Sequence, residues 1–377
     1  MKLEKLKYNL SMRIIISGGG TGGHIYPAIA IADALKKREP LIDILFVGAQ
    51  KRMEMEKVPA AGYPIKGLWI SGLQRKLTFS NLSFPLKVIH SMIRCKTIVK
   101  SFHPDVVVGV GGYASGPLVR VASQMRIPSV LQEQNSYPGI TNKLLAKKAH
   151  TICVAYPGME KFFPKEKIVM TGNPMRSQLG KIISREEAAS LFGLDPKKQT
   201  ILAFGGSLGA RTINETIQQS HDLVAGRDDI QVLWQIGKLY AEKFLDSHTA
   251  RLSNVKAFVF IDRMDMAYAI ADVVIARAGA ITISELCLTG KAAILIPSPH
   301  VAEDHQTHNA RSLTHLGAAV LIPDAEAPDK AFGEALRLLD HPEEMNSLET
   351  NIRHLGRPGA ADEIADIIIR IAKTGKR

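Results

Sequence analysis

The sequence predicts an α/β protein made of two Rossmann-like domains, each with a parallel sheet covered on both faces. Short apolar runs rich in β-branched residues alternate with helix-like segments, which is typical of parallel strands buried on both sides. A strand followed by close-set glycines and a helix occurs twice, at 14–24 and at 200–211. The 377 residues suffice for two domains with separate cores.

In the first half of the chain, apolar runs predict seven strands. They lie at 14–16, 42–47, 65–70, 105–110, 129–132, 151–154 and 168–171. Helices are expected directly after the first glycines, with Pro27 in the first helical turn, and then at 52–57, up to Phe102 and near 142–148. A polar segment begins after Arg176, so the first domain is predicted to span residues 1–176.

The second domain is predicted to span residues 177–356. Its expected strands lie at 200–204, 231–236, 255–261, 272–276 and 293–296, with helices at 264–271 and around Ser284. A turn signal at 357–359 precedes a helix with isoleucines at 364, 367, 368 and 371.

The first glycine-rich loop, from Gly18 to His24, has the character of an anion cradle. Glycine permits a positive φ and lets a ligand approach the backbone, and the first N–H groups of a helix attract negative charge. The loop matches neither GxGxxG nor the Walker P-loop. A tight strand-to-helix turn without a ligand remains an alternative interpretation.

Composition points to an intracellular protein without a membrane span. Cys95, Cys153 and Cys287 are widely spaced and odd in number, which favours reduced thiols in a cytosolic protein over a disulfide framework. The N-terminus lacks the apolar core of a secretory signal. No apolar stretch approaches the ~20 residues needed to cross a bilayer.

The formal net charge of +12 is unevenly distributed. No acidic residue lies between Glu56 and Asp105, and the stretch 69–100 mixes Lys and Arg with large apolar residues. This pattern predicts contact with an anionic membrane surface, although the apolar residues could instead fill a core. No nucleic-acid-binding motif is present, so we expect no nucleic-acid partner.

Seven motifs along the chain resemble, in the same order, those of one family. They are GGTGGH (19–24), GGYASGP (111–117), EQN (133–135), GNPMR (172–176), GGSLGAR (205–211), RAGA (277–280) and QTHN (306–309). The set resembles the MurG family of GT-B glycosyltransferases, and the resemblance runs from about Met12 to Lys373.

The resemblance implies two Rossmann-like domains facing each other across a cleft. The first would hold the acceptor and contact the membrane, the second would hold UDP-GlcNAc, and the helix at 357–377 would pack back on the first. It implies transfer of GlcNAc from UDP-GlcNAc to the C4 hydroxyl of MurNAc in lipid I, with inversion, to give β-1,4-linked lipid II. The location implied is peripheral, on the cytoplasmic face of the plasma membrane.

On the acceptor side, the inverting transfer that the resemblance implies needs a base for the acceptor hydroxyl, and the position of His24 at the start of the first helix suits this role. A neutral imidazole suits this role near pH 7, and the positive end of a helix disfavours its charged form. Alternatively, the His24 ring closes the loop or contacts phosphate. Thr21, Gly22 and Gly23 would face the acceptor diphosphate or the reacting centre, with Tyr113 and Asn135 nearby.

On the donor side, the resemblance assigns a contact to each part of UDP-GlcNAc. It implies that Arg176 and the Ile261 backbone contact uracil and that Glu285 binds the ribose. The phosphates would be bound by Ser207 and by the backbone amides of Ala280, Ile281, Thr282, Ile283 and Ser284. Gln306 and Asn309 would bind GlcNAc. Three alternatives stay open. Thr282 and Glu285 could form a capping box, Ser207 could be an N-cap, and Arg176 could form an interdomain salt bridge.

No metal or cofactor is expected. His300, His305 and His308 lie beside Glu303 and Asp304, but three ligands would have to converge from one loop, and GT-B enzymes as a class need no divalent ion. Two rival functions remain, a UDP-GlcNAc 2-epimerase of the same fold and a dinucleotide-binding protein. The second expects an acidic residue about 20 positions beyond the first loop, and Asp43 lies near that distance but within a strand.

Overall fold

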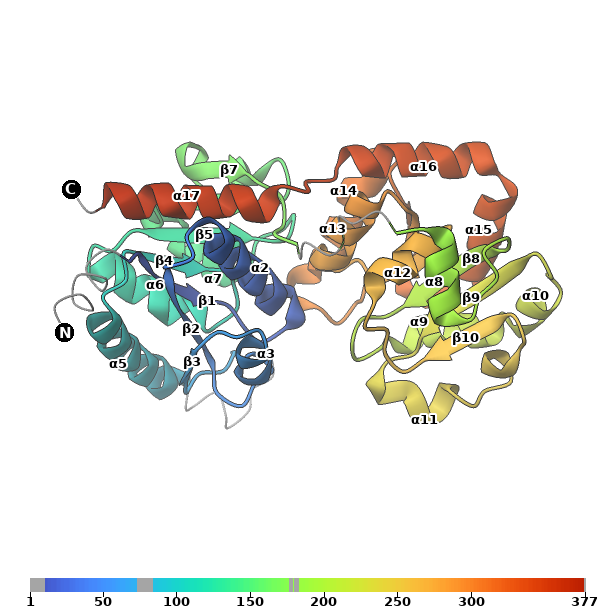
Figure 1. The fold of residues 1–377 in the computed structure, drawn as a ribbon, viewed down its shortest axis with the longest axis horizontal. Helices are drawn as coiled ribbons and strands as arrows, with labels where there is room; N and C mark the ends of the chain where they lie inside the picture. Colours follow the sequence, from blue (N-terminus) through green and yellow to red (C-terminus); the bar gives the residue numbers. More distant parts are fainter. Residues whose placement is uncertain (1–10, 73–83, 176–178, 180–182, 376–377) are drawn as a thin grey trace. The chain divides into compact units, whose positions relative to one another are not determined.

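The chain forms two compact α/β units (Figure 1). The computed structural model describes residues 11–72, 84–175, 179 and 183–375. Unit 1 comprises Met1–Arg176 and Gly359–Arg377, and unit 2 comprises Ser177–Pro358. Each unit contains one parallel sheet, so the prediction of two parallel-sheet domains is confirmed.

Unit 1 contains a seven-stranded parallel sheet with the order β3-β2-β1-β4-β5-β6-β7. Its strands are β1 (Arg13–Ser17), β2 (Asp43–Ala49), β3 (Ile65–Leu68), β4 (Val106–Gly109), β5 (Ser129–Glu133), β6 (Thr151–Val154) and β7 (Ile168–Met170). This is the doubly wound Rossmann order. From β1 the chain adds β2 and β3 on one side, and it then adds β4 to β7 on the other side of β1. The central strands are buried on both sides, which explains their uniformly apolar sequences.

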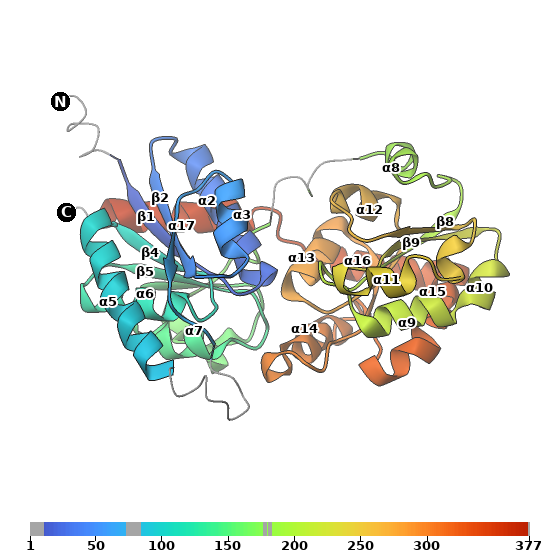
Figure 2. The same cartoon turned by 90° about the horizontal axis from the view of Figure 1, so that it is seen from below.

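Helices cover both faces of this sheet. One face carries α2 (Gly22–Arg38), α3 (Glu54–Ala60) and α17 (Ala360–Thr374), and the other carries α5 (Phe84–Phe102), α6 (Ser115–Gln124) and α7 (Ile140–Leu145). Helix α17, at the red end of the chain, runs alongside α2 in Figures 1 and 2. Ile364 and Ile368 of α17 are fully buried in the core that α2 also lines, and Arg38 of α2 pairs with Asp362 and Asp366.

Unit 2 repeats the architecture with a six-stranded parallel sheet in the order β10-β9-β8-β11-β12-β13. The strands are β8 (Gln199–Phe204), β9 (Ile230–Gln235), β10 (Val255–Phe258), β11 (Val273–Ala276), β12 (Ala292–Leu295) and β13 (Val320–Leu321). Its helices are α8 (Arg185–Phe192), α9 (Arg211–Gln219), α10 (His221–Ala225), α11 (Ala241–Phe244), α12 (Met264–Ile270), α13 (Ala280–Thr289), α14 (His305–Thr314), α15 (Ala327–Asp340) and α16 (Pro342–His354). The order reverses between β8 and β11.

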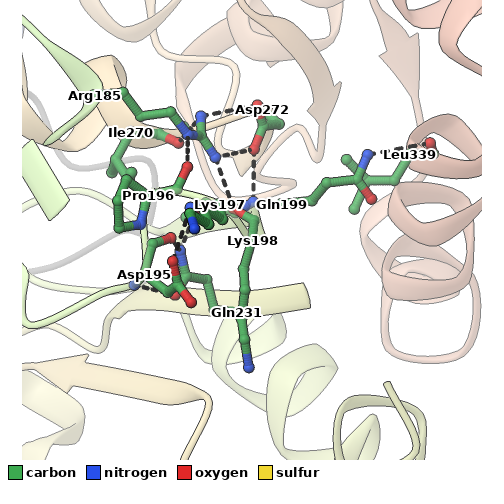
Figure 3. A network of polar contacts seen from close by, with 12 residues as sticks. Arg185, Asp195, Pro196, Lys197, Lys198, Gln199, Gln231, Ile270, Asp272 and Leu339 are labelled. Atoms are coloured by element: carbon green, nitrogen blue, oxygen red, sulfur yellow. Dashed lines mark hydrogen bonds and ion pairs between the residues drawn. The ribbon is translucent and has the colours of Figure 1, made fainter. Parts of the chain in front are cut away.

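A network of hydrogen bonds connects the start of α8 to the amino ends of β8 and β11 (Figure 3). The Arg185 guanidinium donates to both carboxylate oxygens of Asp272, at 3.0 and 2.8 Å, and to the carbonyls of Pro196, Lys198 and Ile270. Asp272 also accepts the N–H of Thr200 at 2.7 Å. Because these groups lie at the amino ends of the strands, they support the fold at the edge opposite the glycine loops.

Some predicted boundaries were wrong. Helix α2 begins at Gly22, one turn earlier than expected, because Thr21 adopts the extended backbone of an N-cap. Pro27 therefore lies inside the helix instead of in its first turn, and it has no N–H to donate to the carbonyl of Gly23. The strand expected at 255–261 ends at Phe258.

Within the described ranges, no helix is both long and apolar enough to cross a membrane.

Candidate active site

In unit 1, two glycine loops meet where the strand order reverses. One follows β1 and leads into α2, and the other follows β4 and leads into α6. In doubly wound sheets this switch point, at the carboxyl ends of the strands, is where ligands bind. The topology therefore brings the motifs at 19–24 and 111–117 together, although about 90 residues separate them in the sequence.

The two loops touch through backbone and rings, with no room for extra side chains. A Cβ on Gly112, which has a φ of +78°, would lie 2.3 Å from the Gly19 carbonyl oxygen. One on Gly111 would lie 2.9 Å from Nε2 of His24, and one on Gly20 would lie 3.2 Å from the Tyr113 hydroxyl. Glycine is therefore required for the His24 and Tyr113 rings to occupy these positions.

His24 lies in the first turn of α2 and is partly exposed. The ring nitrogen Nδ1 of His24 is 3.1 Å from the hydroxyl oxygen of Thr21, and the backbone N–H of His24 donates to the Thr21 carbonyl. Thr21 is the N-cap residue, but its side chain makes no capping hydrogen bond and pairs with the imidazole instead. When Nδ1 carries the proton, it donates a hydrogen bond to the Thr21 hydroxyl oxygen, and Nε2 is the basic nitrogen.

Asn135 lies on the turn after β5 and is held by a buried carboxylate. Oε1 of Glu133 accepts the Asn135 N–H at 3.0 Å and its Nδ2 at 3.2 Å. Oε2 accepts the N–H of Gly139 at 3.2 Å and Nδ2 of Asn142 at 2.8 Å. Burial raises the pKa of Glu133, and these hydrogen bonds oppose the rise. The network fixes the turn that carries Asn135.

In unit 2, the corresponding loop follows β8. Gly206 and Gly209 have φ values of +87° and +86°, and a Cβ on Gly209 would lie 2.1 Å from the Ile236 carbonyl oxygen. Ser207 is exposed between these glycines. The N-cap of α9 is Ala210, so the N-cap interpretation of Ser207 is wrong.

A glutamine that the sequence analysis did not single out connects this loop to Ile261. Gln235, at the end of β9, donates from Nε2 to the Gly206 carbonyl at 3.1 Å and accepts the Ile261 N–H on Oε1 at 2.8 Å. A ligand that used the Ile261 N–H would have to replace this hydrogen bond.

The loop after β11 leads into α13, whose N-cap is Gly279. Thr282 lies within the first helical turn, so the capping-box interpretation of Thr282 and Glu285 is wrong. The Ile283 N–H donates to the Gly279 carbonyl and is part of the helix. The first-turn amides thus come from Ala280, Ile281 and Thr282, and the Ser284 hydroxyl donates to the Ala280 carbonyl.

Glu285 lies one turn further along α13 and is partly exposed. Its Oε2 accepts a hydrogen bond from the hydroxyl of Tyr268, over 2.9 Å. Tyr268 on α12 is fully buried, and burial together with the Glu285 charge raises its pKa well above the usual value. One oxygen of the Glu285 carboxylate is therefore held by a neutral hydroxyl donor.

The remaining donor-side residues differ in accessibility. Gln306, near the start of α14, accepts the Ser298 N–H on Oε1 at 2.8 Å. Asn309 is fully buried and donates to the Ala278 carbonyl at 3.3 Å, so it supports the turn before α13. Arg176 lies outside the described residues. Across the described part of the chain, His, Cys, Asp and Glu side chains form no group of three that could hold a metal ion.

Both units match one family of known proteins. The model of the glycosyltransferase family 28 N-terminal domain matches residues 14–154, and that of the family 28 C-terminal domain matches residues 200–365. The chain belongs to glycosyltransferase family 28.

Two relatives are named UDP-N-acetylglucosamine–N-acetylmuramyl-(pentapeptide) pyrophosphoryl-undecaprenol N-acetylglucosamine transferase. The protein from Parabacteroides distasonis is 53% identical over 95% of this chain and 98% of its own. That from Porphyromonas gingivalis is 52% identical over 98% of each.

Solved structures agree with this family assignment. The crystal structure of MurG from Acinetobacter baumannii aligns with a TM-score of 0.75 and 27% identity, covering 95% of this chain and 99% of that one. The resemblance to the MurG family is thus confirmed. A UDP-N-acetylglucosamine 2-epimerase aligns with a TM-score of 0.66 at 15% identity, over 97% of this chain and 98% of its own, and therefore shares the fold alone.

Proposed function

We propose that this protein transfers GlcNAc from UDP-GlcNAc to the C4 hydroxyl of MurNAc in lipid I, forming lipid II with inversion at the anomeric carbon. The observation that carries the proposal is sequence identity. Across both units, 52–53% of the aligned residues are identical to those of relatives whose names state this activity. The rival epimerase shares only the fold, at 15% identity.

In unit 1, the geometry suits His24 as the base that takes the proton of the acceptor hydroxyl. The Thr21 hydroxyl oxygen, 3.1 Å from Nδ1, would hold the tautomer that leaves Nε2 basic. Gly22 and Gly23 begin α2, where helix-end N–H groups favour the acceptor diphosphate. Tyr113 and Asn135, each held by its loop, would contact the acceptor sugar.

In unit 2, the glycine loop after β8 and the start of α13 suit the UDP leaving group. Ser207 and the first amides of α13 would bind the phosphates and stabilise the charge that develops as the glycosidic bond breaks. The Glu285 carboxylate, held by Tyr268, would accept hydrogen bonds from the ribose hydroxyls. Uracil would lie near the Ile261 backbone and GlcNAc near Gln306, with Asn309 supporting the turn before α13.

Membrane contact is proposed for the outer face of α5. Leu86, Ile89 and Ile93 are spaced by three and four residues and are 64%, 58% and 64% exposed, whereas Cys95, Ile98 and Val99 of the same helix are buried. Basic side chains surround the exposed face: Arg94, Lys96 and Lys100 on α5, and Lys87, whose Nζ lies 5.9 Å from the ring centre of Trp69. Part of the basic stretch, 73–83, lies outside the described residues.

A second apolar pair belongs to the same face of the sheet. Ile140 and Leu144 of α7 are exposed beside Lys147 and Lys148, and α6 contacts both α5 and α7. Apolar groups flanked by lysines favour the interface of an anionic bilayer. The protein would thus act as a peripheral protein on the cytoplasmic face of the plasma membrane.

The transfer assay tests the proposed activity. Purified protein, UDP-[¹⁴C]GlcNAc and a lipid I analogue, incubated with EDTA, should give labelled lipid product. Release of free N-acetylmannosamine or its UDP derivative without labelled lipid would support the epimerase instead. For the membrane contact, Ile93→Glu should weaken co-sedimentation with phosphatidylglycerol vesicles, whereas Leu223→Glu, at an exposed leucine of unit 2, should not.

A further inference from the structure

Glu54 is a buried carboxylate beneath the first glycine loop. It is the first residue of α3 and has no exposed surface. Its Oε2 accepts the N–H of Gly20 at 3.1 Å, and its Oε1 accepts the N–H of Ala49, at the end of β2, at 2.9 Å. One side chain thus joins the loop after β1 to the carboxyl end of the neighbouring strand.

Two glycines leave room for this carboxylate. A Cβ on Gly19 would lie 2.2 Å from Oε1 of Glu54, and one on Gly48 would lie 2.6 Å from its Cγ. The glycine at position 19 is therefore explained by Glu54 rather than by the approach of a substrate. The Gly20 N–H is likewise used by Glu54, so it is already paired before any anion arrives.

The segment that Glu54 holds supports the other site residues of unit 1. The Tyr113 ring packs on Gly20, and the Gly19 carbonyl lies against Gly112 of the second loop. Burial raises the pKa of Tyr113. The Glu54 charge adds to this rise, and the Arg52 charge opposes it. Tyr113 and Glu54 therefore act on the same short stretch of backbone.

We propose that Glu54 is a positioning residue for the acceptor-side reaction, acting through the backbone of Gly19 and Gly20. This inference rests on the proposed function, in which the loop serves the acceptor. A carboxylate can accept both N–H groups, whereas a glutamine has one acceptor oxygen and would turn an NH₂ group toward the other donor.

The first test is Glu54→Gln, which preserves the shape of the side chain. We expect kcat/KM for the lipid I analogue to fall at least about tenfold, the size expected when a buried N–H loses a charged partner, while the Kd for UDP changes less than about twofold. Tyr63→Phe is the matched control, because it removes a hydrogen bond to Asp33 in the same unit, away from the loop, and should leave both constants unchanged.

The second test uses Gly19→Ala and the double variant Gly19→Ala/Glu54→Ala. The new methyl group should displace the Glu54 carboxylate, so Gly19→Ala should reproduce the loss seen in Glu54→Ala. The double variant should then be no worse than either single variant, since both remove the same interaction. Fully multiplicative losses would contradict the proposal.

Hydrogen exchange provides a readout that does not depend on turnover. In Glu54→Gln, the amides of Gly20 and Ala49 should exchange faster than in the unaltered protein. Unaltered exchange at both, or an equal loss of UDP affinity, would overturn the positioning role. If the unaltered protein makes no labelled lipid, the proposed function itself fails, and faster exchange would then support only the loop-holding contact.

Discussion

The Tyr268 hydroxyl donates a hydrogen bond to Oε2 of Glu285, with 2.9 Å between the oxygens. Tyr268 is fully buried and Glu285 is partly exposed, so the tyrosine fixes one carboxylate oxygen from inside the unit. This geometry is what a carboxylate needs to present its other oxygen in a defined direction.

Glu285→Ala should raise the KM for UDP-GlcNAc by about 10- to 100-fold, the equivalent of about 1.5–3 kcal/mol for hydrogen bonds to a charged group. The KM for the lipid acceptor should change little. Tyr268→Phe should raise the donor KM by a smaller factor, because the carboxylate stays but loses its fixed orientation. Steady-state kinetics with each substrate varied in turn check this, and a larger effect on the acceptor KM would contradict the ribose role.

His24→Ala should lower kcat by about 100- to 10,000-fold, the range typical of general acid–base catalysis. UDP affinity, measured by calorimetry, should remain near that of the unaltered protein. Thr21→Val should give a milder loss, since it keeps the imidazole but removes the oxygen 3.1 Å from Nδ1. A His24→Ala variant with unaltered kcat would exclude the base role.

Asp272→Ala should destabilise unit 2 without direct effect on either substrate. The change removes the paired carboxylate of Arg185 and the acceptor of the Thr200 N–H, at the amino ends of the strands. Loss of a partly buried hydrogen-bonded pair costs about 1–3 kcal/mol, or roughly 2–4 °C in melting temperature for each kcal/mol. Lys330→Ala, which breaks an exposed pair with Glu326, should leave the melting temperature unchanged.

The three thiols should resist alkylation in the native protein. Burial raises the pKa of each from the ordinary 9.0 to about 12, so roughly one thiol in ten thousand is ionised at pH 8. Iodoacetamide at pH 8 should therefore label Cys95, Cys153 and Cys287 only after denaturation. Rapid labelling of any of them in the native state would contradict their burial.

The same raised pKa values fix the sign of a pH effect on stability. Between pH 9 and about 12 the unfolded chain releases thiol protons that the folded chain keeps. The thiol contribution is therefore fully present below pH 9 and is lost as the pH rises toward 12. Denaturant titrations should show a shallower loss over this window in Cys153→Ala than in the unaltered protein.

Much of the fold could be predicted because buried parallel strands have uniformly apolar sequences. The run at 151–154 forms β6 with the predicted bounds, because its apolar residues are buried on both faces of the sheet. Pro27 was misplaced because proline is common in the first turn, whereas here the Thr21 backbone starts the helix one turn earlier.

The site was predictable where glycine motifs mark it and not where support comes from distant positions. Glu54 and Gly20 are 34 residues apart, and Glu54 stands in a charged helix start that looks solvent-exposed. Gln235 ends an apolar strand and shows its role only through contacts with Gly206 and Ile261. Within the basic stretch 69–100, Ile70 is buried, as expected for an apolar residue that fills the core, whereas Leu86, Ile89 and Ile93 are exposed.

The most direct test of the central claim is the ratio of UDP released to GlcNAc incorporated into lipid, with EDTA present. We expect one UDP for each GlcNAc transferred, and a product whose new bond is β-1,4 to MurNAc by NMR. UDP release without lipid-linked GlcNAc, or recovery of the sugar as a 2-epimer, would contradict the transferase assignment.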